Sequence, residues 1–194
     1  MKKIFFCLLL LNFQNLNAQT LEWFEGSLVL SNGDVLIGKT SNTPEHDLIL
    51  FQQGESRMVY PAHRIQSLYF YDKSSNINRR YISLTKFHSG RPSYQLYEVI
   101  MKGEVTVVRR KKENAFSVHT DALDFNYFIL YNNELTPLRK FNKKIFPQLL
   151  ISSDNRLEEF ISINRLTAHH AANTLRIIEF YNGLIKTEGS LARN

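Results

Sequence analysis

The chain has 194 residues and a formal net charge of +6 at pH 7, from 24 Lys and Arg against 18 Asp and Glu. This length suits one hydrophobic core, or one domain with a helical appendage. The mild basic excess permits an anionic partner without requiring one. The single cysteine, Cys7, lies in the N-terminal apolar run. A chain that loses this run therefore has no disulfide, no thiolate metal site and no cysteine nucleophile.

The N-terminus has the pattern of a secretory signal peptide. Two lysines precede the apolar run 4–11, and Ala18 is a small residue just before Gln19, so we expect cleavage after Ala18. The run is too short for a transmembrane helix, which needs about 20 apolar residues. The sequence thus predicts a signal peptide over 1–18 and an exported protein, periplasmic or outer-membrane-associated, with no transmembrane segment after signal removal. An exported chain without disulfides is typical of a bacterial cell envelope.

From residue 25 to about residue 140, apolar runs alternate with turn residues, which predicts consecutive antiparallel strands. Asn32-Gly33 between the runs 26–30 and 35–39 is the strongest short hairpin signal, because both residues accept a positive φ. Further hairpins are predicted for 48–51 with 57–60, 67–72 with 79–87, and 94–101 with 104–111, with a turn or one helical turn at 61–64 and a loop at 89–93.

The last two predicted strands differ in character. Phe125–Tyr131 is apolar on both faces, which indicates a central strand. The following strand, 135–139, contains Pro137, which suggests the edge of a sheet.

The hydrophobic period changes after residue 140 and predicts helices. They are expected at 142–150, at 155–166 and from Thr167 through Tyr181, with a stop at Asn182-Gly183 and a frayed tail beyond. Leu175 and Ile178 lie on the apolar stripe of the last helix and are expected to be buried.

The predicted fold class is therefore α+β. A mainly β domain, an antiparallel sandwich or a partly open barrel, occupies 19–140. A C-terminal helical subdomain at 141–194 packs on it.

Several segments resemble uncharacterised exported envelope proteins of Bacteroidetes. They are Asn17-Ala18-Gln19, the opening 25–34, the step Tyr60-Pro61-Ala62, and the ending 125–138 followed by short helices that close on 179–182. The function of those proteins is unknown. The resemblance implies an exported envelope protein and assigns neither an activity nor functional residues.

Common catalytic and metal-binding motifs do not occur in the sequence. It contains no HExxH, no Gly-x-Ser-x-Gly elbow and no Gly-rich phosphate loop. His46 lies between two acids, and His169-His170 is a histidine pair. Adjacent residues rarely chelate one ion, and neighbouring helical side chains diverge by about 100°. We therefore expect no catalytic residue, no cofactor and no metal ligand.

Basic runs are the most visible polar feature: Arg79-Arg80, Arg109 to Lys112, and Lys143-Lys144. Because a guanidinium meets phosphate or carboxylate in two places at once, Arg79, Arg80, Arg109 and Arg110 are the candidate anion-binding residues. Alternation along a strand sends neighbours to opposite faces, so one arginine of each pair is expected to share a face. The other interpretation is a solvated strand edge that opposes aggregation.

Two functions fit these observations. The first is a non-catalytic exported envelope protein that binds or scaffolds an unknown envelope component, an anionic one if the arginines converge; export argues against nucleic acid as the partner. The alternative is an envelope hydrolase whose carboxylate or histidine site is assembled across strands, which a deep pocket with converging buried titratable groups would favour.

Overall fold

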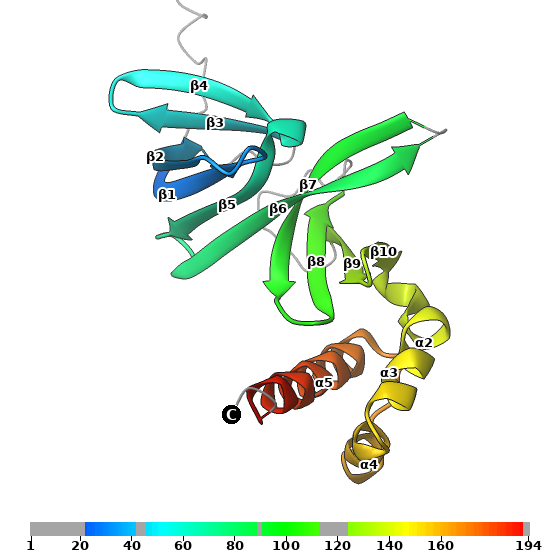
Figure 1. Cartoon of the computed structure of the whole chain (residues 1–194). Helices are drawn as coiled ribbons and strands as arrows, with labels where there is room; N and C mark the ends of the chain where they lie inside the picture. Colours follow the sequence, from blue (N-terminus) through cyan, green and yellow to red (C-terminus); the bar gives the residue numbers. More distant parts are fainter. Residues whose placement is uncertain (1–21, 42–45, 89–90, 113–123, 192–194) are drawn as a thin grey trace, which may run out of the picture.

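The computed structural model describes residues 22–41, 46–88, 91–112 and 124–191. Ten antiparallel strands form one open sheet in the order β10-β9-β8-β7-β6-β5-β1-β2-β3-β4, and helices follow at its C-terminal end (Figure 1). The predicted α+β class, mainly antiparallel β with a helical C-terminal part, is confirmed. The predicted signal peptide and its cleavage point lie outside the described residues.

The strands are β1 (Trp23–Leu30), β2 (Val35–Ser41), β3 (Leu48–Gln53), β4 (Ser56–Pro61), β5 (Ile65–Asp72), β6 (Ile77–His88), β7 (Arg91–Met101), β8 (Thr106–Lys111), β9 (Phe125–Tyr131) and β10 (Glu134–Pro137). Single 3-10 turns, η3 (Ala62–Arg64) and η5 (Leu138–Lys140), follow β4 and β10. The helices are α2 (Phe141–Lys144), α3 (Phe146–Ser152), α4 (Arg156–Ile163) and α5 (Ala171–Leu191). None of these described helices is long and apolar enough to cross a membrane.

The connections of the sheet follow the turn chemistry of the sequence. Asn32-Gly33 joins β1 to β2, and Gly33 has the positive φ, 92°, that this turn requires. The hairpins predicted around β3–β4, β5–β6 and β7–β8 are all present. Every neighbouring pair in the sheet joins consecutive strands except β1 and β5.

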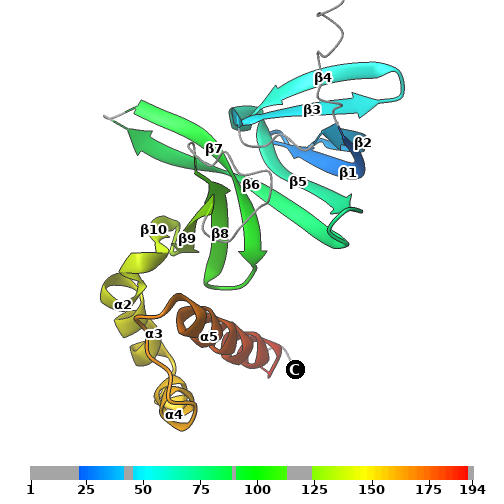
Figure 2. The same ribbon diagram turned by 180° about the vertical axis from the view of Figure 1, so that it is seen from behind.

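A first hydrophobic core lies inside the curl of the N-terminal strands. Alternate residues of β1 and β5 point into it, among them Leu28 and Leu68. Ile49 of β3 and Leu96 of β7 belong to the same cluster, although β5, β6, β1 and β2 separate their strands in the sheet. The sheet therefore bends around this core, as the two views of the ribbon show (Figures 1 and 2).

A second hydrophobic core joins the other end of the sheet to the helices. Val107 and Ile129 supply its sheet side, and Leu149, Leu157 and Ile178 supply helical side chains. The predicted burial of Ile178 is confirmed. Leu175 packs against the same cluster but is only half-buried, so that part of the prediction is wrong.

Two strand predictions need correction. β9 (Phe125–Tyr131) is not central, because only β10 lies outside it. Ile129 and Tyr131 belong to the core shared with the helices, whereas Phe128 packs on Tyr97 of β7. The predicted loop at 89–93 is too long, because Arg91, Pro92 and Ser93 pair with β6. Among the described residues no strand pairs with β7 on its other side at Pro92, so the missing N–H of this proline leaves the ladder intact.

The predicted helix stop at Asn182-Gly183 is wrong, since α5 continues to Leu191. The side-chain amide of Asn182 instead bonds to the backbone of Val105, as a neighbouring strand would. Its Oδ1 accepts the backbone N–H of Val105 and its Nδ2 donates to the Val105 carbonyl, both at 2.9 Å. This pair keeps Val105 out of β8, which begins at Thr106. Gly103 is required beside it, because an added Cβ would lie 2.3 Å from the Asn182 side chain.

We expect Asn182→Ala to lower the free energy of unfolding by about 1–3 kcal/mol, because the backbone of Val105 loses both partners while it stays buried. Urea unfolding measures this loss. Asn173→Ala is the matched control on the same helix, because Asn173 makes only a 3.4 Å bond in an exposed position; it should cost less than about 0.5 kcal/mol. Equal losses in the two variants would show that Asn182 does not anchor the helix.

Candidate functional site

The ladder between β7 and β8 ends before the two strands do. Their pairing stops at Glu98↔Arg109, whereas β7 pairs with β6 as far as His88↔Arg91. The β6–β7 hairpin therefore extends past β8 as a separate wing (Figure 1). The opening between the wing and the β8–β9 pair exposes side chains of four strands.

Asp47, just before β3, bonds to β7 and β8 where their pairing has ended. Its Oδ1 accepts the backbone N–H of Leu96 at 2.8 Å, a donor that a longer β8 would otherwise pair. Arg110 donates to both carboxylate oxygens of Asp47, at 2.5 and 2.9 Å, and to the Leu96 carbonyl at 3.2 Å. The Asp47–Arg110 pair thus takes the place of the backbone hydrogen bonds that β8 does not make to this part of β7, and it ties the base of the wing to β8.

A cavity of about 320 Å³, here called the basic cavity, lies in this opening. Its lining carries four cations and two side-chain amides, and no acidic side chain is among the described residues that line it. The lining residues are Lys86, Gln95, Tyr97, Arg110, Lys111, Lys112, Asn126 and Phe128.

Packed aromatic rings form one wall of the basic cavity. Tyr97 is only 1% exposed, and its ring meets Phe128 edge-on at a centroid distance of 5.5 Å. Its hydroxyl donates to Gln95 Oε1 at 2.9 Å. Burial raises the pKa of Tyr97 above its ordinary value, with Asp47 adding to the rise and Arg110 opposing it. The phenol therefore stays protonated and orients the Gln95 amide.

A second cavity, of about 580 Å³, adjoins the first; we call it the aromatic cavity. It lies where the start of β9 and the end of β10 meet α2 and the start of α5. Three of its lining residues, Lys112, Asn126 and Phe128, also line the basic cavity. The others are Phe125, Tyr127, Pro137, Leu138, Arg139, Asn142, Ala168, His169, Ala171 and Thr174.

The opposite face of the sheet carries a buried ionic network. Arg79 donates to Asp72 and to Glu98, and Arg109 donates to the second oxygen of Glu98, each at 2.7 Å. The two acids are nearly inaccessible, at 2% exposure for Asp72 and 6% for Glu98. Arg109 also lies 4.0 Å from the ring centroid of Phe125. The network joins β5, β6, β7 and β8 across the middle of the sheet.

Asp72 is held in its charged form. Burial alone would raise the pKa of this carboxyl, but hydrogen bonds from Ser74, Arg79 and Ser75 outweigh burial and place the pKa well below its ordinary value. A carboxyl whose folded pKa lies below its unfolded value of about 3.9 stabilises the protein at neutral pH. That stabilisation starts to fall as the pH drops below the unfolded pKa, and it is lost through the folded pKa.

We therefore expect Asp72→Asn to be less stable than the wild type at pH 7 and to show a shallower loss of stability below pH 4, since it has no proton to take up at this position. Urea unfolding at a series of pH values measures the slope. Ser74→Ala keeps the carboxyl but removes its 2.6 Å hydroxyl donor, so its slope should lie between the two. An identical slope for Asp72→Asn and the wild type would contradict the assignment.

The four arginines singled out in the sequence divide between the two faces. Arg79 and Arg109 meet at Glu98 on one face, and strand alternation puts Arg80 and Arg110 on the other. Arg80 lies 4.9 Å from the ring centroid of Tyr69. Only Arg110 lines the basic cavity.

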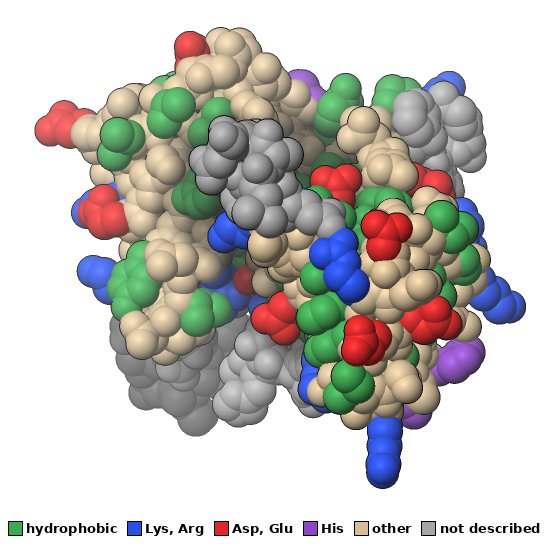
Figure 3. Space-filling view, turned by 60° about the horizontal axis from the view of Figure 1, so that its bottom comes forward, with side chains coloured by type: hydrophobic (Ala, Val, Ile, Leu, Met, Phe, Trp, Pro, Cys, Tyr) green, Lys and Arg blue, Asp and Glu red, His purple; other side chains and the backbone are tan. Residues whose placement is uncertain are grey.

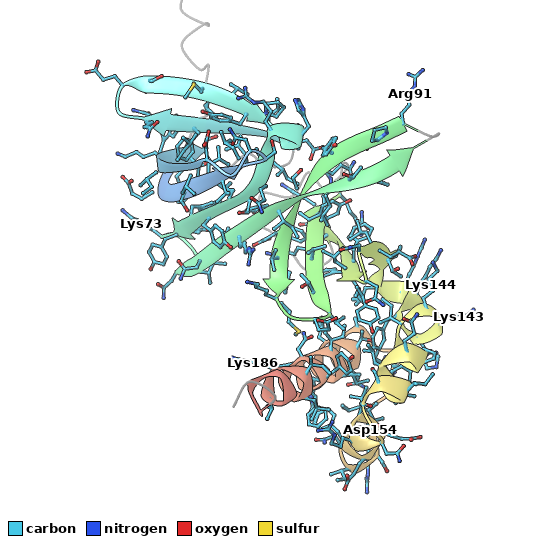
Figure 4. The ribbon with its side chains drawn as sticks, in the orientation of Figure 1. Lys73, Arg91, Lys143, Lys144, Asp154 and Lys186 are labelled. Carbon is cyan, nitrogen blue, oxygen red and sulfur yellow. The ribbon has the colours of Figure 1, made fainter. Side chains whose placement is uncertain are left out.

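The remaining basic pair lies elsewhere. Lys143 and Lys144 lie on α2, far from Arg91 at the tip of the β6–β7 wing (Figure 4). Lys144 is 2.9 Å from Glu134. On the face that carries α4 and α5, acidic and basic side chains are interspersed, so the described residues visible there give no field of one sign (Figure 3).

Both acids of the ionic network are engaged by donors of the protein itself. Both oxygens of Asp72 and both oxygens of Glu98 accept bonds from arginine, serine or backbone donors. A hydrolytic carboxylate must instead meet a substrate or water. Within the described ranges, no group of three or more His, Cys, Asp and Glu side chains could hold a metal ion.

Sequence reasoning missed most of the basic cavity. Lys86, Gln95 and Asn126 come from β6, β7 and β9, and none of them belongs to a basic run. Lys111 and Lys112 do belong to the basic run that stands out in the sequence. The two lysines at the end of that run, rather than its arginines, were therefore the residues from which the sequence could have indicated the cavity.

Comparison with known proteins adds no relative to this description. No protein-family model matches the chain, and no curated protein or solved structure matches it at a significant level.

Proposed function

We propose that the protein is a non-catalytic binding protein of the cell envelope, and that the basic cavity is its site for an anionic ligand. The observation that carries the proposal is the lining of this cavity: three lysines, Arg110, whose charge is paired with Asp47, and two amides, with no acid among the described lining residues. Its volume, about 320 Å³, lies at the lower end of the usual range for ligand pockets, about 300–1,000 Å³.

The charges of the cavity are divided between fixed and adaptable groups. Arg110 is held by Asp47 and by the Leu96 carbonyl, so its guanidinium costs little entropy to position. Lys86 and Lys112 are exposed, on the wing and at the end of β8 respectively. Among the described residues, neither lysine has an acid within 4.0 Å, so a phosphate, sulfate or carboxylate can bring the two ammonium groups together.

The proposed setting is the bacterial cell envelope. It is supported by the signal-peptide pattern over 1–18 and by the resemblance of several segments to exported Bacteroidetes proteins. A ligand there would be an envelope component with exposed negative charge.

We expect the double change Lys86→Gln and Lys112→Gln to weaken binding of glucuronate and of inorganic phosphate at least tenfold, because the two adaptable cations of the cavity are lost. NMR titration detects binding through the side-chain amides of Gln95 and Asn126. Binding by the wild type should also weaken with added salt, since the charges face water.

The matched control is the double change Lys143→Gln and Lys144→Gln. It removes the same charge from α2, which lies away from the wing (Figure 4), and should leave the titration unchanged. An equal loss in the control would mean that net charge alone attracts the anion. An unchanged affinity in Lys86→Gln/Lys112→Gln would refute the site.

A further inference from the structure

The aromatic cavity is the larger hollow, and the anion site described above does not use it. Lys112, Asn126 and Phe128 line both cavities. Alternation along β9 puts Phe125 and Tyr127, with Arg109, on the face opposite to Asn126 and Phe128. The two cavities therefore meet around the edge of β9 at residues 125–127, which β10 leaves unpaired. We propose that the two cavities form one groove that binds an acidic oligosaccharide, with an acidic group in the basic cavity and the next sugar rings in the aromatic cavity. This inference rests on the proposed function and specifies its ligand.

The walls of the aromatic cavity match the two kinds of surface on a sugar. Phe125 and Tyr127 are half-buried, with ring centroids 6.5 Å apart and planes tilted by 59°. The Arg109 guanidinium lies over Phe125 and holds that ring in place. Such rings offer flat apolar area to the C–H face of a sugar at a low cost in side-chain entropy.

Polar side chains of the same cavity suit the hydroxyl groups. Asn142 Nδ2 lies 3.4 Å from His169 Nε2, and the exposed Arg139 stands in the same lining. A lipid chain placed in this cavity would cover the Arg139 guanidinium without giving it an acceptor and would offer nothing to the remaining polar atoms of Asn142 and His169, which costs free energy. A sugar supplies hydroxyl partners to them, so the lining favours a glycan over an acyl chain.

The arrangement predicts that affinity depends on ligand length. A single acidic sugar occupies only the basic cavity. A longer chain that is bound there also contacts the aromatic cavity, and this second contact is intramolecular and therefore adds affinity. Isothermal titration with galacturonic acid and its tetramer measures the difference. We expect the tetramer to bind at least tenfold more tightly than the monomer.

Variants assign the length effect to the aromatic cavity. The change Arg139→Gln with His169→Ala, both at exposed positions, should reduce the affinity for the tetramer to within about threefold of that for the monomer. The change Lys86→Gln with Lys112→Gln should weaken monomer and tetramer alike. Circular dichroism and thermal unfolding check that each variant keeps the fold.

Three chemical probes test the assignment to an acidic sugar. The tetramer with its carboxylates reduced to alcohols should lose most of its affinity, and tetraphosphate and tetraglutamate should bind no more tightly than the galacturonic acid monomer. Tight binding of tetraphosphate or tetraglutamate would overturn the assignment to a sugar. Equal affinity for monomer and tetramer, with monomer binding still sensitive to Lys86→Gln/Lys112→Gln, would overturn the groove and leave the anion site standing. Insensitivity of all binding to that double change would overturn the anion site itself.

Discussion

Replacing Glu98 by alanine is expected to lower the free energy of unfolding by about 3–5 kcal/mol. Glu98 is the shared acceptor of Arg79 and Arg109, with one carboxylate oxygen for each at 2.7 Å. Its removal leaves two guanidinium groups against a buried sheet face, and only Arg79 keeps a second acid, Asp72. Urea unfolding followed by circular dichroism measures the loss.

Glu134→Ala is the matched control for that experiment. Glu134 also forms a short ion pair, 2.9 Å from Lys144, but the two side chains are 66% and 50% exposed. Exposed pairs of this kind contribute about 0–1 kcal/mol. Similar losses at Glu98 and Glu134 would show that burial does not govern the network.

Replacing Asp47 by alanine is expected to cost about 2–4 kcal/mol and to free the β6–β7 wing. The Leu96 N–H loses its acceptor and Arg110 loses both bonds to the carboxylate, and an unsatisfied donor costs about 1–3 kcal/mol, more when charged. Asp47 also has a φ of 58°, which alanine adopts with strain. Urea unfolding gives the total, and hydrogen exchange at the Leu96 amide should report faster opening.

Two further changes at Asp47 separate the causes. Asp47→Gly accepts the positive φ but has no side-chain oxygen, so it isolates the loss of the acceptor. Asp47→Asn tolerates the φ and keeps one side-chain oxygen for the Leu96 N–H, so it should be the least destabilised of the three. Unchanged protection of the Leu96 amide in Asp47→Gly would contradict the bridging role.

The sequence predicts those features that depend on neighbouring residues. The Asn32-Gly33 turn, the edge position of the strand with Pro137 and the helical C-terminal part follow from local backbone preferences and hydrophobic spacing. The helix stop at Asn182-Gly183 also satisfied a local rule. It failed because the Asn182 amide satisfies the backbone of Val105, 77 residues away.

The candidate site depends on contacts that are distant in the sequence. Strand alternation correctly separates Arg79 from Arg80, but nothing near either arginine in the sequence indicates Glu98 as the partner of Arg79, 19 residues away. The basic cavity exists because the β7–β8 ladder ends at Glu98↔Arg109. Beyond that ending Asp47, 63 residues before Arg110, bonds to Arg110 and to the Leu96 N–H, and only the folded register brings these residues together.

The order of the strands has a consequence for folding kinetics. Eight of the nine neighbour pairings in the sheet link consecutive strands, and the ninth joins β1 to β5 through the contact Leu30↔Ile65. Consecutive antiparallel pairing keeps the loops that must close short, and folding rates fall as the sequence separation of contacts grows. We therefore expect the chain to fold faster than Greek-key proteins with the same number of strands. Closure of β1 onto β5, which completes the first hydrophobic core, is the pairing expected to set the rate.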